Sequence, residues 1–329
     1  MARNDDIIEL ISLHVRGDEK QWEEGVRRIC AYYKSIHKED FVERIDRALR
    51  GHRASWVTLE PNGAEVVKHG LAFADESSIR IENLVLADSL RDALKLFMQE
   101  RACAEKLREA GLQPARKILL YGAPGNGKTM TARAIAGELG LPLYTVSSEK
   151  VIDSYLGSTA KNLSKIFSGI KDTIGVWFFD EFDSLARSRS RGSDAAEGEM
   201  GRLMGSLLQF IERDKSDSII VAATNMPQIL DKALYRRFDA VLEFTQPTPT
   251  LAIELMYKVL GSGFMDKFET PLIIECAKGL SYAEIELACK AARKEEIISG
   301  KPMCDQDVVR HMHERQKAAA ARKSKMEAE

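Results

Sequence analysis

Residues 117–129 read KILLYGAPGNGKT, in which a short apolar strand runs directly into the pattern G-x-x-x-x-G-K-T. Small residues in such a loop let backbone N–H groups converge on phosphate oxygens. Lys128 places a positive charge at the terminal phosphates, and the hydroxyl of Thr129 is a hard oxygen ligand for Mg²⁺. We therefore expect ATP and Mg²⁺ to bind at Gly122, Ala123, Pro124, Gly125, Asn126, Gly127, Lys128 and Thr129.

A chance match is the alternative to a binding loop. Four fixed positions coincide by chance in roughly one per cent of chains of this length. The context lowers that fraction, because the loop lies between the apolar run 118–121 and a helical pattern that begins at Lys128, as the motif requires. The positive end of that helix would point at the bound anion.

The loop is part of a regular alternation of strand and helix patterns. The strands are continuous apolar runs, as expected when helices cover both faces of a sheet. Such alternation predicts an α/β fold with a doubly wound parallel sheet. The expected strands are 117–121, 143–146, 176–180, 218–224 and 241–244, and the expected helices between them are 128–139, 160–171 and 199–213.

The flanking segments do not follow this alternation. Apolar residues recur at helical spacing up to residue 50, the period is lost around Pro61-Asn-Gly63, and only helical patterns follow Pro249. A charged helix over 88–110 precedes the first strand. The predicted domains are a helical adapter or partner module over 1–50, a linker over 51–83 that could contain short strands, the large α/β ATPase subdomain over 84–247, a helical lid over 248–317 and a charged, fraying tail over 318–329.

An acidic pair follows the apolar run 176–179. Asp180 and Glu181 come at the carboxyl end of that expected strand, where open α/β sheets bind their ligands. Asp180 can hold Mg²⁺, directly or through water, and Glu181 can act as the general base that polarises an attacking water. An acidic turn after a buried strand is the alternative, but the phosphate-binding loop upstream favours the catalytic interpretation.

The bulk composition argues against several classes of protein. The 329 residues carry a formal net charge of −2, so the basic excess typical of a nucleic-acid binder is lacking. The five cysteines are scattered without a C-x-x-C pair, which argues against a disulfide framework or a zinc site. We find neither an apolar stretch long enough to span a membrane nor a secretory signal. We expect a cytoplasmic protein without a membrane or nucleic-acid partner.

Residues 84–300 resemble the AAA ATPases, in the branch that contains protein-remodelling and protein-unfolding motors. The stretch IIVAATN, which ends at Asn225, is similar to the sensor-1 strand of that family, and this implies that Asn225 helps to place the attacking water. Residues 227–239 are similar to the second region of homology, which implies that Arg236 and Arg237 act on the ATP of a neighbouring subunit. Such a guanidinium would neutralise charge that develops on the transferred phosphoryl group. A solvated surface pair is the alternative.

The segment Ser154-Tyr-Leu-Gly157 resembles the first pore loop of the family. The resemblance implies that Tyr155 and Leu156 project into the channel of a ring and grip extended polypeptide, whereas local packing of the pair is the alternative. The family usually has Glu where Ser158 stands, and this departure could weaken a link between neighbouring pore loops. Residues 187–198 correspond to the second pore loop, whose arginines could touch substrate or nothing.

Residues 279–286, GLSYAEIE, resemble the start of the lid helix that closes over adenine in this family. The resemblance implies nucleotide contacts at Ala283 and at Met130, which directly follows the phosphate-binding loop. Tyr282 stands where this branch usually has Gly, so the nucleotide contacts could be altered, or Tyr282 could stack nearby. No sensor-2 arginine is evident, which is ordinary in this branch.

The resemblance implies an ATP-hydrolysing motor that assembles as a homo-oligomeric ring, with six subunits as the family habit, and remodels, unfolds or threads a protein substrate. The N-terminal helices resemble the short domains of bacterial AAA ATPases that accompany subtilisin-like serine proteases in phage defence, which implies a partner protease; a generic adapter is the alternative. Two other functions stay open. One is an ATP-dependent switch or scaffold for a partner effector, which does not need Tyr155 and Leu156, and the other is a DNA-directed AAA protein, against which the charge argues.

Overall fold

The computed structural model describes residues 61–151, 158–182, 205–226, 235–261 and 270–328. The chain divides into two units, Met1–Trp56 and Val57–Glu329, and the described residues all belong to the second. Within them, six strands form one sheet in the order β1-β3-β4-β5-β2-β6. The strands are β1 (Ala72–Asp75), β2 (Lys117–Gly122), β3 (Leu143–Val146), β4 (Val176–Phe179), β5 (Ile219–Thr224) and β6 (Ala240–Phe244).

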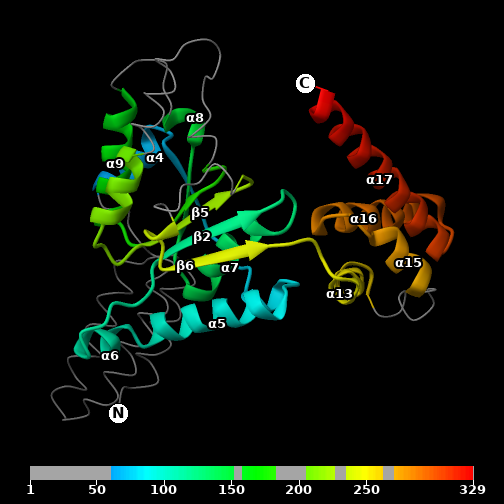
Figure 1. Cartoon of the computed structure of the whole chain (residues 1–329), viewed down its shortest axis with the longest axis horizontal. Coiled ribbons are helices and arrows are strands. Elements are labelled where there is room, and N and C mark those ends of the chain that lie inside the picture. The colour runs from blue at the N-terminus through cyan, green and yellow to red at the C-terminus, as the bar shows by residue number, and fades with distance from the viewer. Residues whose placement is uncertain (1–60, 152–157, 183–204, 227–234, 262–269, 329) are drawn as a thin grey trace, which may run out of the picture. The chain divides into compact units, whose positions relative to one another are not determined.

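The five strands β2 to β6 pair in parallel, and β1 pairs antiparallel with β3 at one edge of the sheet. Helices cover both faces, so this part of the chain has three layers (Figure 1). One face carries α5 and α7, and the other carries α4, α9 and a helix over 205–213. The bounds are α4 (Pro61–Lys68), α5 (Asp88–Ala102), α6 (Ala104–Glu109), α7 (Lys128–Leu139), α8 (Ser148–Val151) and α9 (Ser158–Asp172). The predicted α/β fold with a parallel sheet is confirmed.

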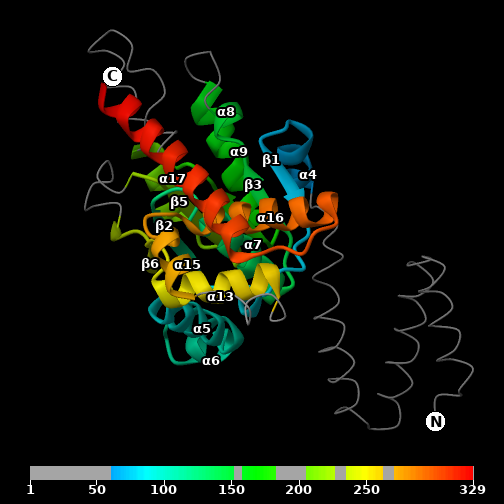
Figure 2. The ribbon, with the colours of Figure 1, turned by 90° about the vertical axis from the view of Figure 1, so that its right-hand side faces the viewer.

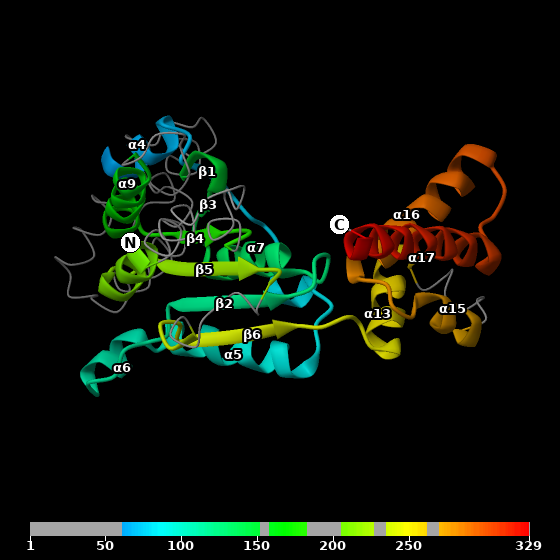
Figure 3. The ribbon, with the colours of Figure 1, turned by 45° about the horizontal axis from the view of Figure 1, so that its top comes forward.

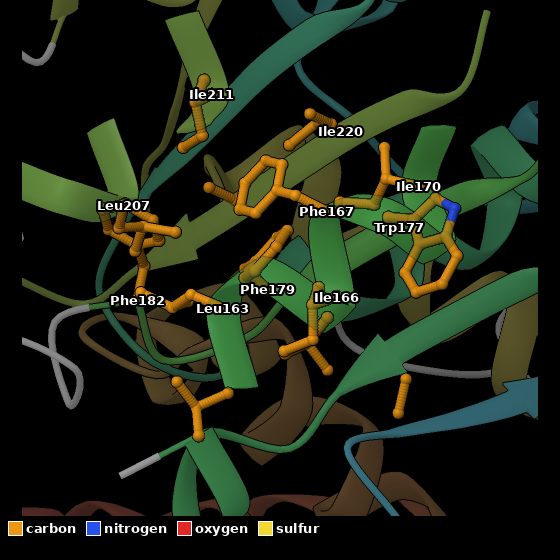
Figure 4. Close-up of a cluster of buried hydrophobic side chains, with 14 of the residues drawn as sticks. Leu163, Ile166, Phe167, Ile170, Trp177, Phe179, Phe182, Leu207, Ile211 and Ile220 are labelled. Atoms are coloured by element: carbon orange, nitrogen blue, oxygen red, sulfur yellow. The ribbon is translucent and has the colours of Figure 1, made fainter. Parts of the chain in front are cut away.

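Strand β4 shows how the two cores are built. Trp177 and Phe179 point into the core beneath α9, and the strand residues that alternate with them point into the core beneath α7. Figure 4 shows the first core, in which Phe167 of α9 lies near Phe179. The indole of Trp177 stacks on the ring of Tyr144, with centroids 4.5 Å apart. Burial of each such side chain contributes roughly 1.5–3 kcal/mol, so this packing fixes β4 and thereby Asp180 at its end.

The C-terminal region is helical, as predicted, and has a core of its own. Met256, Ile285, Val308 and Met312 are fully buried in it, and small residues such as Ala288 let the helices approach closely. A hydroxyl cap opens the helix that begins at Tyr282, because Ser281 Oγ accepts from the N–H of Glu284. The helices are α13 (Pro249–Leu260), α15 (Thr270–Ala277), α16 (Tyr282–Ser299) and α17 (Asp305–Ala328).

The segment expected as a linker over 51–83 contains a short strand, which the sequence left open, and also a helix, which was not expected. Pro61 begins α4, which is compatible with helix because proline is tolerated in the first turn. Val66 of that helix is buried against α9, and β1 adds to the sheet beside β3. The helix has eight residues and the strand four, so neither is long enough to show a clear period in the sequence. Both segments belong to the folded domain.

Two other expectations on helices need correction. The single helix expected over 88–110 is interrupted at Cys103, which separates α5 from α6. The tail expected to fray over 318–329 instead continues α17 to Ala328, consistent with its run of Ala, Lys and Arg, which are strong helix formers. Among the described residues, no helix is both long and apolar enough to cross a membrane.

Candidate nucleotide site at the carboxyl edge of the sheet

The predicted nucleotide-binding residues lie where parallel strands end. The arrowheads of β2, β5 and β6 all point toward the helical C-terminal region (Figure 3). Gly122 ends β2, Asp180 follows β4 and Asn225 follows β5. Because β4, β5 and β2 are neighbours in the sheet, these three strand ends deliver their residues to one place.

The loop after β2 has the backbone that a phosphate cradle requires. Gly125 and Gly127 have φ angles of 79° and 95°, in the left-handed region that favours glycine. Gly127 is also the N-cap of α7, so the positive end of that helix opens into the loop. Lys128 Nζ donates to the carbonyl oxygens of Gly122 at 2.6 Å and Ala123 at 2.9 Å, which holds its charge within the loop. A loop of this shape suits an anionic ligand.

Two hard oxygen donors meet beside this loop. Thr129, in the first turn of α7, has its Oγ1 3.0 Å from Oδ2 of Asp180, which follows β4. Ser148 Oγ donates to the backbone oxygen of Asp180 at 3.1 Å and so anchors the segment that follows β4. A hydroxyl and a carboxylate fit Mg²⁺, which prefers few protein ligands and completes its shell with water and phosphate oxygens. Thr129 and Asp180 are thus the residues that would hold the metal.

Glu181 has an unusual backbone conformation. Its φ is 48°, and it is the only residue other than glycine with a positive φ in the described part of the chain. Such a conformation costs about 1–3 kcal/mol and persists where the surroundings enforce it. Here Glu181 N–H donates to Asp180 Oδ1 at 2.9 Å, and the buried Phe182 donates its N–H to the carbonyl of Ala223 at 2.8 Å. The fold therefore fixes the backbone of Glu181 at the strand ends, and its side chain is exposed there.

The lid helices meet the loop through backbone contacts. The N–H of Ala283 donates to the carbonyl of Gly125 at 3.0 Å. A side chain at Gly125 would collide with the lid, since an added Cβ would lie 2.7 Å from Ser281 Oγ and 3.3 Å from Ala283 Cβ. On the other side, Lys258 Nζ donates to the carbonyl of Glu82 at 3.2 Å. The start of α16 therefore closes one side of the site.

These elements enclose one cavity of about 860 Å³, a size usual for sites that bind drug-sized ligands. Five cationic and three acidic side chains line it, which favours an anionic ligand. The lining residues are Asn83, Leu84, Val85, Leu86, Pro124, Gly125, Asn126, Gly127, Lys128, Thr129, Met130, Thr131, Asp180, Glu181, Asn225, Leu255, Lys258, Val259, Tyr282, Ala283, Glu286, Lys290, Arg293 and Lys294.

Comparison with known proteins agrees with this geometry. Residues 118–246 match the family model described as "ATPase family associated with various cellular activities (AAA)". The uncharacterized AAA family ATPase y4kL of Sinorhizobium fredii is 39% identical over 222 residues, which cover 67% of this chain and 65% of that protein. The chain contains an AAA-family ATPase domain.

The names of two further relatives state an activity. ATP-dependent zinc metalloprotease FtsH 2 of Salinibacter ruber is 30% identical over 218 residues, 64% of this chain and 32% of that protein. A proteasome-activating nucleotidase of Methanothermobacter thermautotrophicus is 26% identical over 275 residues, 82% of this chain and 67% of that protein. The chain therefore spans 65% of the length of y4kL and about a third of the metalloprotease.

Most of the predicted site residues line the cavity of the AAA domain, but two loop residues do not. Gly122 and Ala123 instead offer their carbonyls to Lys128. Gly122 is needed because β2 and β6 approach closely there: an added Cβ would lie 2.1 Å from the carbonyl oxygen of Phe244. The predicted pore-loop residues Tyr155 and Leu156 lie outside the described residues.

The arginine pair lies elsewhere in the AAA domain. Arg237 Nε donates to Glu212 Oε2 at 3.1 Å, and Arg236 is exposed. Just after the pair, Asp239 Oδ2 accepts from the N–H of Lys117 at 2.9 Å, at the amino end of β2. Both arginines are within the described residues, and neither lines the cavity.

Sequence reasoning missed the apolar part of the AAA cavity. Leu84, Val85 and Leu86 reach it from the segment before α5, and Leu255 and Val259 reach it from α13. These residues follow no fixed spacing, because the fold brings them together from segments far apart in the chain. The sequence does contain the apolar run 84–86, but such a run is equally typical of the hydrophobic core, so it does not by itself indicate a binding site.

Proposed function

We propose that the AAA domain hydrolyses ATP to ADP and phosphate in this cavity, with Mg²⁺ bound at Thr129 and Asp180. The observation that carries the proposal is the convergence of a phosphate loop, a hydroxyl–carboxylate pair and a conformationally fixed glutamate on one cavity. Water would attack the γ-phosphorus while the bond to the bridging oxygen of ADP breaks. Glu181 would accept the proton of that water.

The other cavity residues would position the reactants. Lys128 and the amino end of α7 would neutralise the β and γ phosphates. Asn225, at the end of β5, would orient the attacking water, and the N–H of Met226 fixes the turn there by donating to Thr224 Oγ1 at 3.0 Å. When bound, the metal supplies Lewis-acid neutralisation of phosphate charge.

We infer that hydrolysis is completed between copies of the chain, in a ring of six subunits. The support is the position of Arg236 and Arg237, which belong to the segment that resembles the second region of homology and do not line the cavity of their own chain. Within one chain, Arg236 and Arg237 bring no positive charge to the cavity. A guanidinium group from a neighbouring subunit would supply that charge.

We propose that the ring acts on a protein substrate in the cytoplasm. The relatives named as a proteasome-activating nucleotidase and as ATP-dependent metalloproteases support a protein-directed role. The test is Tyr155→Ala, with Tyr257→Ala as control. Tyr257 lies on α13, is 41% exposed and does not belong to the proposed pore loop.

Loss of the aromatic contact at Tyr155 should leave basal ATP turnover within a few-fold of wild type and abolish unfolding of a tagged, folded reporter protein. The control should keep both activities. A Tyr155→Ala protein that unfolds the reporter normally would rule out threading. It would favour the second candidate, an ATP-dependent switch that scaffolds a partner effector.

We propose residues 1–50 as the module that recruits a partner, and a subtilisin-like protease in phage defence as that partner. The resemblance of the sequence over 1–50 carries this proposal, and those residues lie outside the described part of the chain. The division of the chain after Trp56 supports an independent unit. Deleting residues 1–56 should leave ATP turnover intact and abolish co-purification with a protease encoded beside it; retained co-purification would contradict the assignment.

A further inference from the structure

The nucleotide cavity combines charged and apolar lining. Lys128, Asp180 and Glu181 lie at the phosphate loop and the strand ends, and the helices α13 and α16 add the charged residues Lys258, Glu286, Lys290, Arg293 and Lys294. Apolar lining residues come from four segments: the stretch before α5, the first turn of α7, α13 and α16. Those apolar residues are Leu84, Val85, Leu86, Met130, Leu255, Val259 and Tyr282. A flat, weakly polar ring is the part of a nucleotide that such a lining suits.

Among the described residues that line this cavity, Tyr282 is the one with an aromatic side chain. It is the first residue of α16 and is half-buried. Its neighbour Ala283 makes the 3.0 Å backbone hydrogen bond to Gly125, so the position of Tyr282 is tied to the phosphate loop itself. The capping box of Ser281 and Glu284 fixes the same turn. The backbone that carries this aromatic side chain is therefore fixed next to the phosphate loop.

The hydroxyl of Tyr282, like any phenol, is neutral near pH 7, and its surroundings disfavour ionisation further. Burial, and secondarily the negative charge of Glu254, raise the pKa of Tyr282 above its ordinary value. Glu254 in turn pairs with Arg91 at 3.7 Å, which joins α13 to α5, two helices that lie next to each other in Figure 2. The phenol thus presents an uncharged ring to the cavity at every pH near neutrality, and an uncharged ring is suited to stacking on a nucleobase.

We propose that Tyr282 contacts the base of the bound nucleotide and contributes a substantial share of the affinity for ATP and ADP. The inference rests on the proposed function and adds a residue that sets affinity through the base rather than through the phosphates. Base–aromatic stacking changes binding by about tenfold or more per base. Glycine, which the AAA branch described above usually has at this position, has no side chain that could stack on a base.

The test compares ADP with inorganic tripolyphosphate, which has phosphates but no base, by titration calorimetry on the full chain with Mg²⁺. The variants are Tyr282→Leu, which keeps an apolar side chain without a ring, and Tyr282→Phe, which keeps the ring. Tyr257→Leu is the matched control, because that tyrosine lies on the neighbouring helix α13 and does not line the cavity. Thermal unfolding without ligand checks that each variant is folded.

Tyr282→Leu should bind ADP about tenfold more weakly and bind tripolyphosphate like wild type. Tyr282→Phe and the control should bind both ligands like wild type. Unchanged ADP affinity in Tyr282→Leu, or equal losses for ADP and tripolyphosphate, would overturn the inference, since the second result means that Tyr282 only positions the lid. Wild-type protein that binds neither ligand would instead overturn the proposed function, and the inference with it.

Discussion

The cavity at the strand ends and the segment of Arg236 and Arg237 differ in how complete they are within one chain. The cavity brings Lys128, Asp180 and Glu181 together, each positioned by its own strand or helix terminus. The arginine segment has its side chains on the surface or paired with Glu212, away from that cavity. The difference suggests that one copy suffices to bind the nucleotide and that a second copy is required to hydrolyse it quickly.

The double variant Arg236→Ala/Arg237→Ala should separate ATP binding from ATP hydrolysis most strongly. Turnover should fall on the order of 10³-fold, because charge on the transferred phosphoryl group is no longer neutralised. Affinity for ATP should stay at the wild-type value, because neither arginine lines the cavity. Steady-state turnover and calorimetric titration measure the two effects.

Glu212→Gln is the control for that variant. It removes the pairing of Arg237 at 3.1 Å but leaves both guanidinium groups. Exposed pairs of this kind contribute little to stability, so turnover should remain normal. An equal loss of turnover in Glu212→Gln would mean that the pairing, and not the arginines, matters.

On the cavity side, Glu181→Gln should lower turnover on the order of 10²-fold or more and retain ATP binding. The amide keeps the size of the side chain but cannot accept the proton of the attacking water. Glu149→Gln is a suitable control, because Glu149 is exposed on α8 and does not line the cavity. Near-normal turnover of the Glu181 variant would remove the assignment of the general base.

A smaller effect is expected at the contact between loop and lid. Gly125 and Gly111 have nearly the same φ, 79° and 77°, so an alanine strains the backbone equally at both. Only at Gly125 would the new Cβ meet another group, Ser281 Oγ at 2.7 Å, whereas nothing lies within 4 Å at Gly111. Gly125→Ala should weaken ATP binding about tenfold, as loss of one good contact implies, while Gly111→Ala should lower only thermal stability. Equal ATP affinities would show that the lid contact is dispensable.

The same contrast separates what the sequence predicts from what it does not. The phosphate loop, Asp180–Glu181 and Asn225 were predictable because each follows an apolar strand directly, and the ends of parallel strands share an edge. Position in the chain therefore implied position in space.

Elements whose partners are distant in sequence were not predictable in this way. β1 pairs with β3, more than sixty residues later in the chain, and four residues carry too little pattern to announce that pairing. The apolar residues of the cavity come from the segment before α5, from α13 and from α16, so only the folded structure shows that they lie together. These segments are brought together by tertiary packing, which the local spacing of apolar residues in the sequence does not predict.

The central claim, that the cavity of one copy uses the arginines of another, is tested most directly by mixing two inactive variants. Glu181→Gln lacks the general base but keeps Arg236 and Arg237, and Arg236→Ala/Arg237→Ala keeps the base but lacks the arginines. Each alone should turn over ATP very slowly. When equal amounts of the two variants are mixed and the head-to-tail contacts form at random, roughly a quarter of the interfaces pair an intact cavity with intact arginines. Turnover should therefore reappear on mixing and approach about that fraction of the wild-type rate. A mixture as inactive as its two components, under conditions in which the variants co-assemble, would contradict the account.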